Sequence, residues 1–238
     1  MPGAEQKGWA PGPERPLLAA GAVHVWRAEL TTVAASLGEL LCEQERARAK
    51  RIANTRDGEL WRRSRGLLRE LLGRYLDVDP VSLQFVVGEH GKPRLADPPD
   101  QPRSDGGPPA FNMSHSGELA VYAFSDAGAV GVDVEVARRS LNEVAIAARM
   151  LGADEARRLQ ALDPHARQRE FLRAWTCYEA ELKCLGVGLG GREEERLRAL
   201  AGGQRPWTEQ LQTGNDDRAA AVATERPASE LRCWEWLA

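Results

Sequence analysis

Hydrophobic residues recur with two different periods along the first half of the chain, and these periods predict both strands and helices. Residues 22–30 alternate between apolar and polar positions, which is typical of a strand with one buried face. Residues 57–76 carry leucines at intervals of three and four with arginines between them, and therefore predict an amphipathic helix. Residues 36–55 have the same helical spacing, and residues 81–87 predict a further strand.

Loop-forming residues and short apolar runs follow in the middle of the chain. Residues 96–109 are rich in Pro, Gly, Asp and Ser, which predicts an exposed loop. Three short apolar runs come next, over 110–114, 119–124 and 129–136, with turn residues between them. This spacing favours an antiparallel meander of three strands.

The second half of the chain returns to helical periods. The patterns predict three helices, over 140–151, 153–162 and 164–185. Ser140 is placed to cap the first helix, and a glycine-rich segment ends the last. Two further strands are predicted over 218–224 and 231–238.

Each half therefore combines helices with a small sheet, which predicts an α+β fold built from two α/β subdomains. Residues 1–16 are rich in Pro and Gly and predict a flexible N-terminal tail. We expect the N-terminal subdomain over 17–126 and the C-terminal subdomain over 127–238.

Composition narrows the class of protein. The 238 residues are 42% hydrophobic and 28% charged, as in a soluble globular protein, and the net charge of −3 gives no reason to expect nucleic-acid binding. No apolar run is long enough to cross a bilayer, and we expect no signal peptide. The four cysteines form neither a CxxC pair nor a metal-ligand spacing, which favours reduced thiols in the cytoplasm.

Two carboxylates lie on the polar face of the predicted strand "VGVDVEV". With a side-chain period of two, Asp133 and Glu135 project from the same face and repel each other unless water or a cation screens them. A hard cation such as Mg²⁺ takes oxygen ligands of this kind. Gly131 on the same face leaves room for a close approach to the backbone, although a solvated strand face can carry the same pattern.

An acid and a base lie four residues apart on the long helix predicted over 164–185. Glu179 and Lys183 border an apolar stripe, and are either an ordinary surface pair or a partly buried acid beside a positioned ammonium. The second arrangement would suit proton transfer, a metal and a phosphate. The apolar stripe consists of Phe171, Trp175, Tyr178, Leu182 and Leu185.

Further anion contacts are possible in the first half. The segment "FNMSHS" places His115 between Ser114 and Ser116, where they either donate hydrogen bonds to an anion or form a simple turn. No GxSxG motif supports a serine hydrolase. Lys92 in "GKP" is either a phosphate contact or part of a hairpin turn, and the arginine-rich helices form either a basic wall or a solvated face.

The order of these motifs resembles the 4'-phosphopantetheinyl transferases of the Sfp type. That family carries a GKP turn, an FN-x-SHS segment, a G-x-D-x-E strand and a helix of the form W-x-x-K-E-A-x-x-K-x-x-G. Here they read "GKP", "FNMSHS", "GVDVE" and "WTCYEAELKCLG" over residues 91–186. Tyr178 is the one departure, since the family usually has Lys at this position.

The resemblance implies two similar subdomains in a pseudo-twofold arrangement, with the active site at their interface. Such enzymes transfer 4'-phosphopantetheine from coenzyme A to a serine of a carrier protein and release adenosine 3',5'-bisphosphate. Asp133, Glu135 and Glu179 would hold Mg²⁺, with Mn²⁺ as the alternative ion. The resemblance assigns catalysis to Asp133, to Glu179 as the base and to Lys183 as a cation at the pyrophosphate.

Coenzyme A would be held mainly by residues of the first half, together with Lys183. The expected contacts in the first half are Lys92, Pro93, Ser114, His115 and an arginine among Arg51, Arg56 and Arg65. The expected partners are apo acyl or peptidyl carrier domains of fatty acid, polyketide or nonribosomal peptide synthases, bound by a cytoplasmic monomer. A Mg²⁺-dependent pyrophosphate hydrolase and a catalytically silent carrier- or coenzyme A-binding homologue stay open as alternatives.

Overall fold

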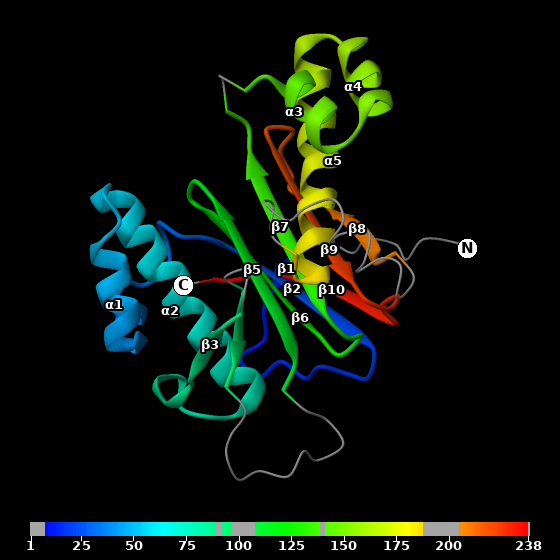
Figure 1. Cartoon of the computed structure of the whole chain (residues 1–238). Coiled ribbons are helices and arrows are strands. Elements are labelled where there is room, and N and C mark those ends of the chain that lie inside the picture. Colours follow the sequence, from blue (N-terminus) through cyan, green and yellow to red (C-terminus); the bar gives the residue numbers. More distant parts are fainter. Residues whose placement is uncertain (1–7, 89–91, 97–107, 139–140, 188–204, 238) are drawn as a thin grey trace.

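The computed structural model describes residues 8–88, 92–96, 108–138, 141–187 and 205–237, which form a five-stranded sheet, a three-stranded sheet, a two-stranded sheet and the helices packed on them (Figure 1). The strands are β1 (Ala10–Pro11), β2 (Ala22–Glu29), β3 (Phe85–Val87), β4 (Pro93–Leu95), β5 (Ala110–Ser116), β6 (Leu119–Ser125), β7 (Val130–Val136), β8 (Trp207–Leu211), β9 (Arg218–Thr224) and β10 (Glu230–Glu235). The α-helices are α1 (Glu43–Lys50), α2 (Thr55–Leu76), α3 (Glu143–Met150), α4 (Ala153–Gln160) and α5 (Pro164–Leu185), and two 3₁₀ helices cover Ala35–Leu40 and Pro80–Ser82.

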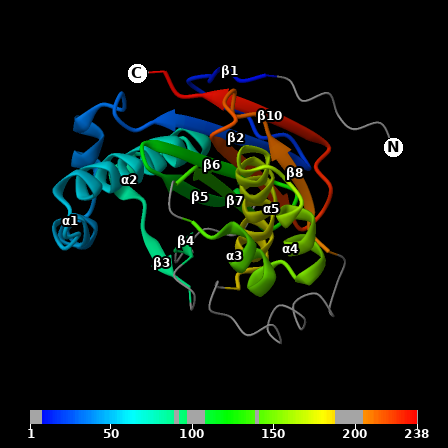
Figure 2. The same cartoon turned by 90° about the horizontal axis from the view of Figure 1, so that it is seen from above.

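The larger sheet has five strands in the order β1-β10-β2-β6-β5. β6 pairs antiparallel with β2 and β5, whereas β10 runs parallel to both β1 and β2. Leucines of α2 pack on one face of this sheet against Trp26, Tyr122 and Phe124, all of which are buried. Figure 2 shows α1 and α2 together at this side of the molecule.

The smaller sheet has three strands in the order β7-β9-β8, and α5 lies across β7 and β9. The two sheets pack on each other through apolar side chains, among them Val25 and Val121 from the first sheet and Val132 and Val222 from the second. Helices α3 and α4 pack against the N-terminal half of α5, at the end away from the first sheet (Figure 1). Among the described residues, no helix combines the length and apolar composition needed to cross a bilayer.

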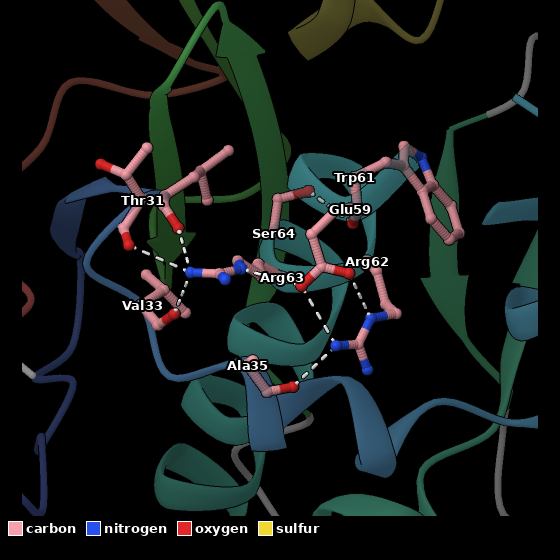
Figure 3. A network of polar contacts seen from close by, with 9 residues as sticks. Thr31, Val33, Ala35, Glu59, Trp61, Arg62, Arg63 and Ser64 are labelled. Atoms are coloured by element: carbon pink, nitrogen blue, oxygen red, sulfur yellow. Dashed lines mark hydrogen bonds and ion pairs between the residues drawn. The ribbon is translucent and has the colours of Figure 1, made fainter. Parts of the chain in front are cut away.

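Side-chain hydrogen bonds fasten α2 to the chain that precedes it (Figure 3). Arg63 donates from one nitrogen to the carbonyls of Leu30, Thr31 and Val33, and Glu59 holds its guanidinium in place at 2.9 Å. The Asn54 side chain caps the first turn by accepting from two backbone N–H groups. These contacts give side-chain partners to carbonyl groups of the chain after β2 and to N–H groups at the start of α2.

Most predicted helices and strands are present, but the predicted three-stranded meander is wrong. β5 and β6 do form a hairpin, whereas β7 pairs with β9, about ninety residues later, in the other sheet. The alternation of apolar and polar residues identified the buried face of β7. It could not identify the neighbouring strand, because the same valines are buried whether β7 pairs with β6 or with β9.

Two other segments differ from their predicted form. Residues 36–55 do not form one helix: the chain is extended at Leu41 and Cys42, between the 3₁₀ helix and α1. Of the strand predicted over 81–87, only β3 forms, because Pro80 begins a short 3₁₀ helix capped by Asp79. Ser140 lies outside the described residues, and α3 is capped by Asn142, whose side chain accepts from the Ala145 N–H.

The two ends of the chain meet at the edge of the first sheet. β10 inserts between β1 and β2, so that the last strand belongs to the sheet built mainly by the first half. Ala10 and Pro11, within the tail predicted as flexible, pair with Trp234 and Glu235 of β10. The boundary between the two subdomains at residue 126 stays a prediction. β10 belongs to the second half in sequence but to the sheet of the first half in the structure.

Candidate active site at the junction of the two sheets

The two faces of β7 have different roles. Val130, Val132 and Val134 enter the apolar contact between the sheets, which leaves Gly131, Asp133 and Glu135 facing the other way. Helix α5 lies directly against this second face, where a Cβ on Gly131 would come within 2.1 Å of the Ala180 carbonyl oxygen and 2.4 Å of the Cys184 nitrogen. The close approach expected at this glycine is therefore made by α5, which brings Glu179 and Lys183 to the strand.

Three carboxylates gather where α5 crosses β7. Asp133, Glu135 and Glu179 each contribute an oxygen, and the three oxygens lie within 4.8 Å of one another. Asp133 is 1% exposed and Glu179 is 9% exposed. Burial raises the pKa of all three groups, and burial together with the Asp133 charge raises the pKa of Glu179 to about 7.

The ammonium of Lys183 lies within this group of acids. Its Nζ is 2.5 Å from Asp133 Oδ1 and 3.7 Å from Glu179 Oε2, and it donates to Ser114 Oγ at 3.0 Å. One ammonium does not balance three carboxylates. In addition, Oδ2 of Asp133 is buried with no hydrogen-bond partner among the described residues, which is costly unless a cation or water meets it.

Strand β5 contributes polar side chains from the first half. Asn112, Ser114 and Ser116 alternate along the strand and all contact β7: Asn112 accepts from the Val132 N–H at 2.9 Å, and the two serines donate to carboxylates. The sequence analysis did not single out Asn112, and it named Ser116 only as a possible donor to an anion, without its target. The signal was present, since polar residues occupy alternate positions of "FNMSHS" opposite Phe111 and Met113.

Ser114 and His115 lie on opposite faces of β5, as consecutive strand residues must. Ser114 donates to Asp133 Oδ1 at 2.8 Å and is part of the carboxylate group. His115 is exposed on the other face. The two residues are therefore adjacent in sequence but do not form a single joint contact in this structure.

Lys92 bridges the two halves immediately before β4, which begins at Pro93. Its ammonium donates to the carbonyl oxygens of Val130 at 2.8 Å and of Lys183 at 2.7 Å. Burial lowers the pKa of Lys92, and the nearby Lys183 charge lowers it further. Gly91 of the "GKP" turn lies outside the described residues.

The three candidate arginines differ in how they are held. Arg51 is exposed at the end of α1, and Arg56 is exposed in the first turn of α2, where it pairs with Glu118. Arg65 is buried and its Nε lies 2.7 Å from Glu45, with the guanidinium over the ring of Phe85. The structure therefore uses Arg65 to join α1, α2 and β3, and does not bring the three arginines together.

The buried face of α5 agrees only in part with the predicted apolar stripe, of which Phe171 and Leu182 are buried. Thr176, Ala180 and Cys184 face the sheet and are buried, whereas Trp175 and Tyr178 are only partly covered and contact each other with ring centroids 5.9 Å apart. Small residues occupy the buried positions because the helix backbone lies so close to Gly131. Hydrophobicity alone selects the larger side chains, and therefore did not identify the small residues on the buried face.

Comparison with known proteins relates both halves of the chain to one family. A model described as "4'-phosphopantetheinyl transferase, N-terminal" matches residues 24–126, and a model of the "4'-phosphopantetheinyl transferase superfamily" matches residues 129–223. The two matches cover the two halves of the chain in order. The predicted α+β fold in two parts is therefore confirmed.

Three relatives illustrate the similarity. The 4'-phosphopantetheinyl transferase HetI of Nostoc sp. is 34% identical over 192 residues, which span 79% of each chain. A putative 4'-phosphopantetheinyl transferase of Synechocystis sp. is 36% identical over 64% of this chain and 59% of its own length. The transferase Sfp of Bacillus subtilis is 32% identical over 52% of this chain and 50% of its own length. The chain belongs to the 4'-phosphopantetheinyl transferase superfamily.

Proposed function

We propose that this protein transfers the 4'-phosphopantetheine group of coenzyme A to a serine of an apo acyl or peptidyl carrier protein, in the manner of the Sfp type. The observation that carries the proposal is the group of Asp133, Glu135, Glu179 and Lys183 in the second half of a chain of this superfamily. Ser114 and Ser116 of the first half donate hydrogen bonds to two of these carboxylates. The order of the four sequence motifs supports the Sfp type.

The carboxylate group fits a divalent metal ion. Asp133, Glu135 and Glu179 present only oxygen ligands, as Mg²⁺ and Mn²⁺ require, and Asp133 Oδ2 is a buried oxygen that still needs a partner. These three residues would hold the ion. When bound, it would supply positive charge to the pyrophosphate of coenzyme A.

Two residues of α5 would act on the reacting groups. Glu179, with its pKa near 7, is suited to accept the hydroxyl proton of the carrier serine. The serine oxygen forms a bond to the phosphorus of the phosphopantetheine group, and the bond from that phosphorus to adenosine 3',5'-bisphosphate breaks. Lys183 lies beside Asp133 and would stabilise the negative charge that the leaving phosphate gains.

The nucleotide end of coenzyme A would contact the first half. Lys92 uses two of its three ammonium protons on carbonyl oxygens and keeps one donor for a phosphate. Pro93 on β4 and Ser114 and His115 on β5 are the further proposed contacts, which the two residues of β5 would make from opposite faces of the strand. Arg51 and Arg56 are exposed and could reach a phosphate, whereas the ion pair with Glu45 makes Arg65 the weakest candidate of the three arginines.

Release of adenosine 3',5'-bisphosphate tests the proposal against its alternatives. The purified protein is incubated with coenzyme A and Mg²⁺, with and without an apo carrier protein, and the nucleotide product is measured by chromatography. We expect release only when the carrier is present. Release without a carrier would indicate a hydrolase, and no release with any carrier class, despite coenzyme A binding, would indicate a silent homologue.

A further inference from the structure

β5 and β7 lie side by side at the junction of the two sheets but do not pair through their backbones (Figure 1). β7 is an edge strand of its own sheet, so that its outward N–H groups need other partners. Side chains of β5 supply them: Asn112 accepts from the Val132 N–H, and Ser116 Oγ accepts from the Val136 N–H at 3.2 Å. Polar side chains thus replace backbone pairing between the halves.

Ser116 makes a second contact that reaches the carboxylate group. Its hydroxyl donates to Glu135 Oε2 at 2.8 Å, and the residue is 3% exposed. A serine hydroxyl has one proton. Because the Val136 N–H takes a lone pair of Oγ, the proton is directed to Glu135, and one residue of the first half fixes both the backbone and the carboxylate of β7.

We propose that Ser116 is a positioning residue for Glu135, and that the first half of the chain thereby sets the affinity of the carboxylate group for a divalent cation. This inference rests on the proposed function. Glu135 has several rotatable bonds, and the hydrogen bond from Ser116 restricts them. The loss of a residue that orients a metal ligand typically costs about 10- to 100-fold in metal affinity.

Binding of Mn²⁺ alone tests the proposal without any transfer reaction. Free Mn²⁺ is titrated into the full chain and followed by electron paramagnetic resonance, with coenzyme A and carrier absent. We expect Ser116→Ala to weaken Mn²⁺ binding by about 10-fold or more, and Ser116→Thr, which keeps the hydroxyl, to stay close to the unaltered protein.

Ser64→Ala is the matched control. Ser64 is also buried, and its hydroxyl donates a hydrogen bond at 2.9 Å to the Trp61 carbonyl within its own helix, α2, and not to a residue of β7. Both alanine variants lose a buried hydrogen bond and should lower the melting temperature, Ser116→Ala by more because the Val136 N–H also loses its acceptor. Only Ser116→Ala should lower Mn²⁺ affinity. This difference separates positioning from a general loss of stability.

The results of the Mn²⁺ titration distinguish a failure of the Ser116 proposal from a failure of the proposed transferase function. Mn²⁺ binding by Ser116→Ala within twofold of the unaltered protein would overturn the positioning role and leave the transferase proposal intact. No Mn²⁺ binding by the unaltered protein would overturn the metal site itself. If Ser116→Ala does not fold, Ser116→Cys replaces it, because the thiol has similar volume and donates only weakly.

Discussion

Asp133 is a carboxylate whose two oxygens have different surroundings. Oδ1 accepts from Ser114 and Lys183, whereas Oδ2 is buried and has no partner among the described residues. A buried carboxylate oxygen without a partner costs folding free energy, and proteins retain such groups mainly where they act on a ligand. At the scale of single residues, this oxygen is the strongest structural support for a metal site.

Glu179→Gln tests the proposed base. The amide keeps the size of the side chain but cannot accept the serine proton or carry a negative charge. We expect the transfer rate to fall by about 10²- to 10⁴-fold, with the melting temperature nearly unchanged or raised, because a buried charge is removed. Transfer to an apo carrier is followed under single-turnover conditions.

Glu170→Gln is the control for this variant. Glu170 is on the same helix and pairs with Arg158 and Arg173 at the surface. Its substitution should leave transfer within about twofold, as exposed ion pairs contribute little. Equal rates for Glu179→Gln and the unaltered protein would remove Glu179 from the mechanism.

His24 gives a pH-dependent contribution to stability. It is buried in β2, where Nδ1 lies 2.9 Å from the Tyr75 hydroxyl and Trp26 donates to that hydroxyl at the same distance. Burial, with a contribution from Arg232, lowers the pKa of His24 to about 4. Since the unfolded chain binds this proton at its usual pKa, near 6.5, acid favours unfolding.

The free energy of unfolding should therefore fall as the pH falls from about 6.5 to about 4, by up to about 3 kcal/mol from this group alone. Urea denaturation at several pH values measures it. His24→Gln cannot titrate, and its stability should depend less on pH over this range. The same pH dependence in both proteins would show that His24 does not contribute.

At the scale of elements, the contact of α5 with β7 sets the distance between the carboxylates. Gly131→Ala would place a methyl group against the backbone of α5, at Ala180 and Cys184, where no side chain can move aside. We expect a loss of about 1–3 kcal/mol in the free energy of unfolding from overpacking, together with slower transfer, since Glu179 and Lys183 move with the helix.

Gly8→Ala provides the comparison, because a Cβ at Gly8 meets no atom within 4 Å. Chemical denaturation and transfer rates of both variants are measured side by side. A Gly131→Ala protein that is as stable and as active as Gly8→Ala would contradict the close contact between α5 and β7.

The sequence predicted the bounds of several helices and strands well. Helix α5 was expected over the same residues, 164–185, and β2 and β9 agree almost as closely. Contacts between residues that lie far apart in the chain could not be predicted in this way. Glu45 and Arg65 are twenty residues apart and each is typical of a solvated helix, so that nothing local marks their buried ion pair.

Local spacing predicted only parts of the site. Spacing along one strand placed Asp133 beside Glu135, and spacing along one helix placed Glu179 beside Lys183. That the two pairs share one site was implied by the family resemblance and not by spacing, and the structure brings them together by packing α5 on β7. The contacts of Asn112 and Ser116 cross from one sheet to the other, and no period within β5 could identify their targets.

At the scale of the whole molecule, the halves depend on each other. β10 inserts into the first sheet, with Trp234 against His24 and Trp26 at centroid distances of 4.3 and 4.9 Å. Removing residues 230–238 should therefore unfold the first half, because β2 loses a neighbour and the aromatic core loses a large side chain.

Circular dichroism and a thermal melt of the shortened chain measure this effect. Trp234→Ala in the full chain is the milder variant and should cost about 3–5 kcal/mol, as for other buried tryptophans. A shortened chain with an unchanged melting temperature would show that β10 is dispensable for the fold.

The transfer reaction itself is tested most directly by the intact mass of the acceptor. A purified apo acyl or peptidyl carrier protein is incubated with this protein, coenzyme A and Mg²⁺, in parallel with a sample that contains EDTA, and both are analysed by mass spectrometry. We expect the carrier mass to increase by one phosphopantetheine group, and only where the metal is available. An unchanged mass across carriers of fatty acid, polyketide and nonribosomal peptide synthases, with coenzyme A bound, would contradict the proposed transfer.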